Sequence, residues 1–147
     1  MALRQRINGS RVSSGSPAEV PIRILLADAS PDYRNALARI LNGQPVEIVG
    51  EARDTVELTL AVERLQPDVI LLDPELPGVD GLQLAARVAG KAPSPGVIFL
   101  SLVTGAVKRR SSNVPQSRFL LKENADDRLI EQILELGHRR SKRSRSR

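Results

Sequence analysis

The chain has 147 residues, a formal net charge of +5, no cysteine and one histidine. These counts exclude disulfides and cysteine-based metal sites, and they argue against a zinc cluster or a Ser-His-Asp hydrolase. Hydrophobic residues make up 41%, enough for one core, whereas aromatic residues make up 2%, too few for a base-stacking nucleic-acid surface. Because no apolar run approaches the roughly 18 residues that cross a bilayer, we expect a cytoplasmic protein without membrane contact.

The positive charge lies at the two ends of the chain. The segment 139–147 carries six Lys or Arg residues and no acidic one, and the Ser- and Gly-rich segment 1–21 has a net charge of +2. Residues 22–138 are left with a net charge of −3. We therefore expect a disordered N-terminal extension over 1–21, one domain over 22–138 and a disordered basic tail over 139–147.

Apolar runs typical of buried strands alternate with helical patterns along this domain. The first run is followed by Ser30 and Pro31, which predict the first turn of a helix that ends at Asn42-Gly43. The same alternation continues to the end of the domain. It predicts strands over 22–27, 46–52, 69–72, 96–100 and 118–121, with further helices after Asp54, after Asp80 and from Asp126 to Gly137.

The connection between the last two predicted strands departs from this pattern. Residues 102–117 have few apolar positions, and Ser111, Ser112 and Asn113 are poor helix formers. We expect only a short or irregular helix around 104–112. The domain as a whole predicts an α/β fold, a flavodoxin-like doubly wound parallel sheet with helices on both faces.

Polar residues follow four of the predicted strands. Asp28 follows the first strand, Asp73 the third, Ser101 the fourth and Lys122 the fifth. In doubly wound sheets, ligands bind outside the carboxyl ends of the strands. If the first and third strands are neighbours, the two carboxylates lie close together and invite a divalent cation. With a lysine for a phosphate oxygen and a hydroxyl donor, they predict a phosphoryl-accepting site with a carboxylate nucleophile.

Over residues 22–138 the chain resembles the receiver domain of bacterial two-component response regulators. The matching pieces are ILLADASP, PDVILLDPELPGVDGL, VIFLS and FLLKENADDRLIEQI. The last piece is similar to the receiver subgroup that usually precedes a DNA-binding helix-turn-helix. The resemblance implies a CheY-like fold with five strands in the order 2-1-3-4-5.

The resemblance also implies a role for each residue of the site. Asp73 is then the phosphoacceptor, and Lys122 and Ser101 are the lysine and the hydroxyl of the phosphorylation switch. Asp28, Asp73 and Glu75 are then the Mg²⁺ ligands, with Glu75 at the position where the family uses a backbone carbonyl.

One departure from the family pattern bears directly on this site. The family usually has a pair of adjacent aspartates where this chain has Asp28 and Ala29. Losing a carboxylate ligand should weaken Mg²⁺ binding, although the Glu75 side chain would compensate in part if it turned toward the site. Two interpretations stay open: a receiver phosphorylated on Asp73, or a degenerate pseudo-receiver that binds proteins without phosphorylation.

Simpler roles stay open for individual residues. Asp73 is also placed to cap the following turn, and Asp28 to cap the first helix. Phe119 takes the family's aromatic switch position on the fifth strand, but core packing is the commoner role of such a residue. His138 follows Gly137 and is expected to interact with the dipole at the C-terminus of the last helix.

We expect a stand-alone receiver, because the nine residues after the last predicted helix leave no room for a helix-turn-helix. A histidine kinase or phosphotransfer protein would donate the phosphoryl group, and output would pass through contact with a downstream protein. The chain is then not an enzyme in the metabolic sense. Further expected contacts are a homodimer and a sequence-independent contact of 139–147 with nucleic acid or an acidic surface, with a solvated tail as the alternative.

Overall fold

A computed structural model describes residues 20–91 and 94–145, with side chains described up to residue 138. Five parallel strands form one sheet in the order β2-β1-β3-β4-β5. The strands are β1 (Ile22–Ala27), β2 (Val46–Ala52), β3 (Val69–Leu72), β4 (Gly96–Ser101) and β5 (Ser117–Leu121). The predicted doubly wound sheet and its strand order are confirmed, and the predicted strand boundaries agree to within one residue.

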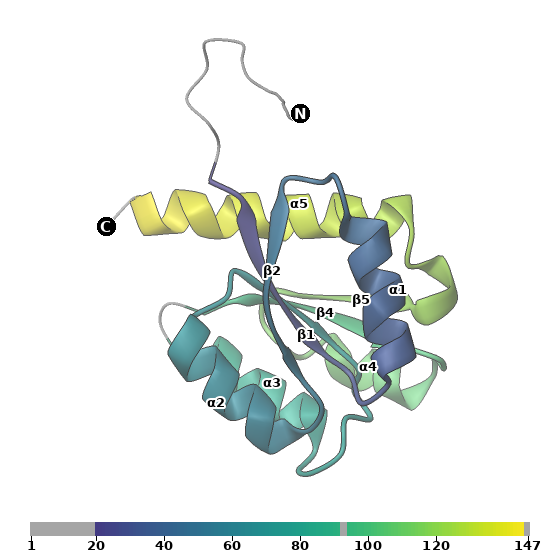
Figure 1. The fold of residues 1–147 in the computed structure, drawn as a ribbon. Helices are drawn as coiled ribbons and strands as arrows, with labels where there is room; N and C mark the ends of the chain where they lie inside the picture. The colour runs from purple at the N-terminus through teal and green to yellow at the C-terminus, as the bar shows by residue number, and fades with distance from the viewer. Residues whose placement is uncertain (1–19, 92–93, 146–147) are drawn as a thin grey trace, which may run out of the picture.

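Helices cover both faces of the sheet (Figure 1). They are α1 (Pro31–Leu41), α2 (Thr55–Leu65), α3 (Gly81–Ala89), α4 (Ala106–Ser111) and α5 (Asp127–Arg145), with a 3₁₀ turn η1 (Lys122–Asn124) before α5. The buried side chains of α1 and α5 pack on one face, and those of α2 and α3 pack on the other. No helix within the described residues has the length and hydropathy needed to span a bilayer.

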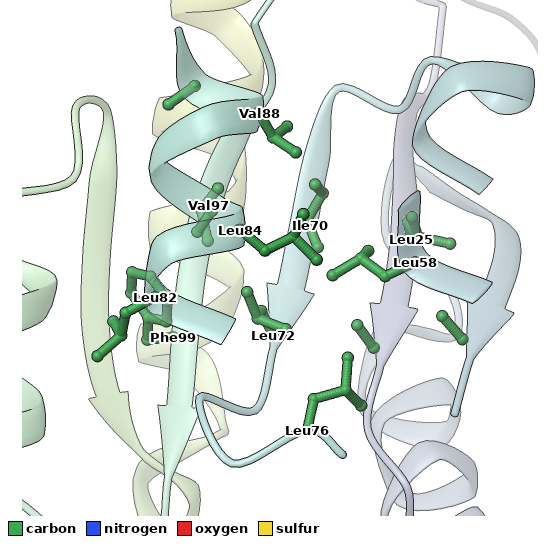
Figure 2. Close-up of a cluster of buried hydrophobic side chains, with 14 of the residues drawn as sticks. Leu25, Leu58, Ile70, Leu72, Leu76, Leu82, Leu84, Val88, Val97 and Phe99 are labelled. Atoms are coloured by element: carbon green, nitrogen blue, oxygen red, sulfur yellow. The ribbon is translucent and has the colours of Figure 1, made fainter. Parts of the chain in front are cut away.

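The strand residues divide between two buried clusters because successive side chains point to opposite faces of a sheet. In β3, Ile70 and Leu72 belong to the cluster under α2 and α3, which Figure 2 shows, while Val69 and Leu71 belong to the cluster under α1 and α5. All four side chains are at most 2% exposed. Each such residue contributes about 1.5–3 kcal/mol by leaving water. Burial on both faces holds β3 in the centre of the sheet and so positions the residues that follow its carboxyl end.

Side-chain caps set where the helices begin. The Ser30 hydroxyl accepts from the Tyr33 amide, and the Asp54 carboxylate accepts from the Glu57 amide. Asp80 accepts from the amide of Leu82 at the start of α3. These are three of the four residues at which the sequence predicts helix starts. Each N-cap oxygen satisfies an amide that has no partner within the helix.

The segment between β4 and β5 contains the six residues of α4. This agrees with the short helix expected around 104–112. Its N-cap residue is Gly105, which has a φ of +80° and provides no side-chain cap. A helix of this length without a cap depends on its neighbours for stability.

The expectation that the last helix ends at Gly137 is wrong, because α5 continues to Arg145. A Cβ atom on Gly137 would lie 2.5 Å from Cδ1 and 2.7 Å from Cγ1 of Ile22. The glycine therefore allows α5 to pack closely against β1 and does not end the helix. It follows that His138 does not lie in the last turn, and that residues 139–145 are helical instead of forming a disordered tail. The expectations for 1–19 and 146–147 lie outside the described residues.

Candidate functional site

Strand register brings the predicted site residues to one edge of the sheet. Ala27 pairs with Leu72, so that Asp28 and Asp73, which follow them, leave adjacent strands at the same level. Ser101 is the last residue of β4, and Lys122 follows the last residue of β5. We call the group formed by Asp28, Asp73, Ser101 and Lys122 the carboxyl-edge site.

The Lys122 ammonium joins the two carboxylates. Its Nζ atom lies 2.7 Å from Oδ2 of Asp28 and 3.0 Å from Oδ2 of Asp73. The exposed fractions of these side chains are 11% for Lys122, 6% for Asp28 and 21% for Asp73. The shared ammonium offsets the repulsion between the two shielded carboxylates. Asp73 is the more accessible of the two.

Backbone amides hold the other oxygen of each carboxylate. The amide of Ser30 donates to Oδ1 of Asp28, and the amide of Glu75 donates to Oδ1 of Asp73, both across 2.8 Å. Each aspartate thus folds back over the turn that follows it, a local pattern to which the short Asp side chain is suited. Both carboxylates are fixed in place from two sides.

Ser101 lies at the base of the same edge and is 1% exposed. Its Oγ atom accepts a hydrogen bond from the Val103 amide at 3.1 Å. A serine hydroxyl has one hydrogen to donate besides its capacity to accept. The Ser101 hydroxyl can therefore donate to an oxygen that arrives next to Asp73.

Tyr33 is part of the site although the sequence did not single it out. The Lys122 Nζ atom lies over its ring, 4.4 Å from the centroid. Burial, followed by the charges of Asp28 and Asp73, raises the pKa of Tyr33 far above its ordinary value. For Lys122, burial lowers the pKa, but the hydrogen bonds to Asp28 and Asp73 outweigh burial and raise the pKa overall. A signal was present, since Tyr33 lies in the first turn of the helix that begins beside Asp28.

Arg34 is the second site residue that the sequence did not reveal. Its Nη1 atom donates to the main-chain oxygen of Asp28, and its Nε atom donates to Glu51, both across 2.5 Å. The Arg34 side chain is 11% exposed, whereas that of Glu51 is 50% exposed, so only the contact with Asp28 is shielded from water. Arg34 thereby ties the loop after β1 to β2 and holds the backbone of Asp28.

The comparison with known families decides which class of domain carries this geometry. The model of the response regulator receiver domain matches residues 24–134. The chain belongs to the response regulator receiver domain family.

Curated relatives of this receiver are protein-glutamate methylesterases/protein-glutamine glutaminases. One from Myxococcus xanthus is 39% identical over 84 residues, 56% of this chain and 24% of the relative. One from Pyrococcus abyssi is 40% identical over 84 residues, 56% of this chain and 23% of the relative.

The match thus spans about a quarter of the length of these relatives. Solved structures agree on the receiver fold. The signal receiver domain of the response regulator NarL from Mycobacterium tuberculosis has a TM-score of 0.73 and 27% identity, covering 82% of this chain and 98% of that one. The response regulator domain of Thermotoga maritima CheB has a TM-score of 0.71 and 27% identity, covering 80% and 97%.

The residues of this receiver do not fit a tight Mg²⁺ site. Ala29 stands where the family usually has a second aspartate, and it is exposed. Over residues 20–91 and 94–145, no three acidic, His or Cys side chains gather as metal ligands, so Glu75 does not complete a set with Asp28 and Asp73. Glu75 contributes its amide to Asp73, and its side chain is exposed. Mg²⁺ requires an octahedron of oxygens, whereas the two carboxylates present already bind an ammonium.

Phe119 of β5 is half-buried and packs against the cluster under α2 and α3. Its core role therefore has direct structural support in this receiver. The aromatic switch role that the resemblance implies stays a prediction.

Proposed function

We propose that Asp73 accepts a phosphoryl group from the phosphohistidine of a histidine kinase or a phosphotransfer protein. The observation that carries this proposal is the convergence of Asp73 with Lys122 at the end of the central strand, with Nζ 3.0 Å from Oδ2. Asp73 is the most exposed of the three charged side chains there, so an incoming phosphorus atom reaches it first.

The transfer step uses residues that are already in place. A carboxylate oxygen of Asp73 attacks phosphorus, the bond from phosphorus to the donor imidazole nitrogen breaks, and that nitrogen takes up a proton. The product is an acyl phosphate on Asp73. The Lys122 ammonium neutralises charge on the phosphoryl oxygens, and the Ser101 hydroxyl donates to one of them. Backbone contacts from Ser30 and Glu75 keep both carboxylates oriented.

Output then passes through contact with a downstream protein in the cytoplasm, without a metabolic enzyme activity. The family membership supports signalling through kinases and target proteins. The two carboxylates that meet at Lys122 support phosphorylation as the input.

The test is incubation with a small acyl phosphate and Mg²⁺, followed by intact mass measurement. The wild-type chain should gain one phosphoryl group, and the Asp73→Asn variant should gain none. A folded wild-type protein that stays unmodified at every Mg²⁺ concentration would contradict the proposal.

A second candidate is a phosphorylation-independent receiver that acts as a protein-binding module. Ala29 favours it, because the site lacks the second acidic side chain. In that case a target should bind the Asp73→Asn variant and the wild-type chain with equal affinity, and treatment with a phosphodonor should change neither.

The helical segment 139–145 supports an additional contact. Five of its residues are Lys or Arg, and α5 carries them beyond the close approach of Gly137 to β1. We propose that it contacts nucleic acid without sequence preference through phosphate charges. Deleting 139–147 should abolish binding to mixed-sequence DNA, and the wild-type affinity should fall steeply with salt. An affinity that salt leaves unchanged would contradict this contact.

A further inference from the structure

The ammonium of Lys122 is surrounded on three sides. Asp28 accepts one of its hydrogen bonds, Asp73 accepts a second, and the ring of Tyr33 lies 4.4 Å away on a third side. An ammonium has three hydrogens and is attracted to the face of an aromatic ring. Its position is therefore set by two loops and by the first turn of α1.

We propose that Tyr33 is a positioning residue that holds the Lys122 ammonium between Asp28 and Asp73, which makes this lysine a built-in competitor of divalent cations. The inference concerns what the carboxylates bind before any phosphoryl transfer, so it goes beyond the proposed function and does not depend on it.

Competition follows from how the carboxylate oxygens are used. Oδ1 of each aspartate accepts a backbone amide, and Oδ2 of each accepts from the Lys122 ammonium. A divalent cation that bridges the two carboxylates competes with the ammonium and those amides for the same oxygens, and its charge repels the ammonium. Ala29 offers no further carboxylate to recover the loss. The affinity for Mg²⁺ is therefore set by how firmly Lys122 is held.

The Tyr33 ring, and not its hydroxyl, contacts the Lys122 ammonium and keeps it in position. The hydroxyl oxygen is buried and has no hydrogen-bond partner within the described residues. Removing it therefore takes no hydrogen bond from Lys122 or from the carboxylates. Phenylalanine at this position keeps the ring face, whereas leucine keeps only the apolar volume. The pair of substitutions separates attraction by the ring from packing.

The test is a titration of the ¹⁵N-labelled full chain with MgCl₂, followed by the backbone amide signals of Ser30 and Glu75. These two amides donate to the competing carboxylates, so their shifts report a cation there directly. Wild type should bind Mg²⁺ weakly. Tyr33→Leu should bind roughly two- to fivefold more tightly, because one attractive contact to the ammonium is gone. Tyr33→Phe should restore the wild-type value, and Lys108→Ala, an exposed lysine of α4, should match wild type.

Lys122→Met supplies a second test that does not depend on Tyr33. It removes the competing charge and should bind Mg²⁺ more tightly than Tyr33→Leu. The inference is overturned if Mg²⁺ affinity is equal in wild type, Tyr33→Leu and Lys122→Met, or if Tyr33→Phe behaves like Tyr33→Leu. A wild-type protein that shows this series but takes up no phosphoryl group would overturn the proposed function alone.

Discussion

The Arg110 guanidinium in α4 donates a hydrogen bond to Asp80, the N-cap of α3, across 2.6 Å. The other oxygen of Asp80 accepts from the Leu82 amide. The hydrogen bond from Arg110, against a smaller opposing effect of burial, lowers the pKa of Asp80. One carboxylate thus begins α3 and holds the uncapped six-residue α4 next to it. Both helices border the loops that leave the carboxyl-edge site.

The helix cap and the ion pair that Asp80 forms should contribute different amounts to the free energy of unfolding. Asp80→Ala removes the cap and should lower the free energy of unfolding by about 1 kcal/mol. Arg110→Ala removes only an ion pair whose side chains are 51% and 35% exposed, and should cost about 0.5 kcal/mol or less. Urea unfolding measures both, with Arg109→Ala as the neutral control. An Arg110→Ala loss as large as that of Asp80→Ala would show that the ion pair dominates the cap.

Gly137→Ala tests the close packing of α5 on β1. Alanine favours a helix interior by about 1 kcal/mol over glycine, but here its Cβ would overlap Ile22, whose Cγ2 lies 2.9 Å away as well. β-Branched Ile22 has little freedom to move aside, so we expect a net destabilisation of about 1 kcal/mol or more in urea unfolding.

Gly90→Ala is the matched control, because nothing lies closer than 3.6 Å to a Cβ atom at Gly90. It should leave stability unchanged or raise it slightly. In an Ile22→Ala background, Gly137→Ala should lower the free energy of unfolding by less than it does in wild type, because the side chain that its Cβ would overlap is gone. Stabilisation by Gly137→Ala would mean that α5 does not approach β1 as described.

Tyr33 should resist ionisation in alkaline solution. Burial, with the Asp28 and Asp73 charges, raises its pKa, whereas in the unfolded chain the phenol ionises near its ordinary value of about 10. The unfolded state therefore loses this proton first, and the stability that the group contributes below about pH 10 should fall as pH rises beyond that value. Because Tyr33 is the sole tyrosine and tryptophan is absent, tyrosinate absorbance reports it alone. Equal midpoints of the Tyr33 titration in buffer and in urea would contradict the burial of this side chain.

Ser101 should affect the transfer step through its hydroxyl. Ser101→Ala removes a donor to the incoming phosphoryl group and should slow phosphorylation roughly tenfold, the effect of one hydrogen bond to a charged group. Ser101→Thr keeps the hydroxyl and should stay closer to wild type. Intact mass measured over time gives the rates. Equal rates for wild type and Ser101→Ala would remove Ser101 from the transfer step.

Local chemistry made much of this fold predictable. Ser30, Asp54 and Asp80 cap helices through amides two or three residues away, and apolar runs mark the buried strands. The strand ends indicated one edge for Asp28 and Asp73, whereas the neighbouring positions of their strands came from the order that the family resemblance implied. Glycine shows the limit of such reasoning: one residue type serves both helix ends and close approaches, and only the position of Ile22 identifies the role of Gly137.

The contacts inside the site could not be predicted in the same way. Lys122 meets Asp28 across 94 residues of sequence, so no local pattern links the two side chains. The Tyr33 ring reaches Lys122 because α1 begins beside that loop. The place of Tyr33 in the first turn of α1 puts it near Asp28, but its spacing does not distinguish a contact with Lys122 from ordinary core packing.

The most direct measurement is the site and extent of phosphorylation after incubation with a small acyl phosphate, mapped by peptide mass in wild type, Asp73→Asn and Ala29→Asp. Ala29 is exposed, so an aspartate there restores the missing carboxylate without disturbing the core. We expect one phosphoryl group on Asp73 in wild type, the same group formed faster in Ala29→Asp, and none in Asp73→Asn. Phosphorylation of Ala29→Asp with none in wild type would contradict this expectation and leave a receiver that binds its partners without phosphoryl transfer.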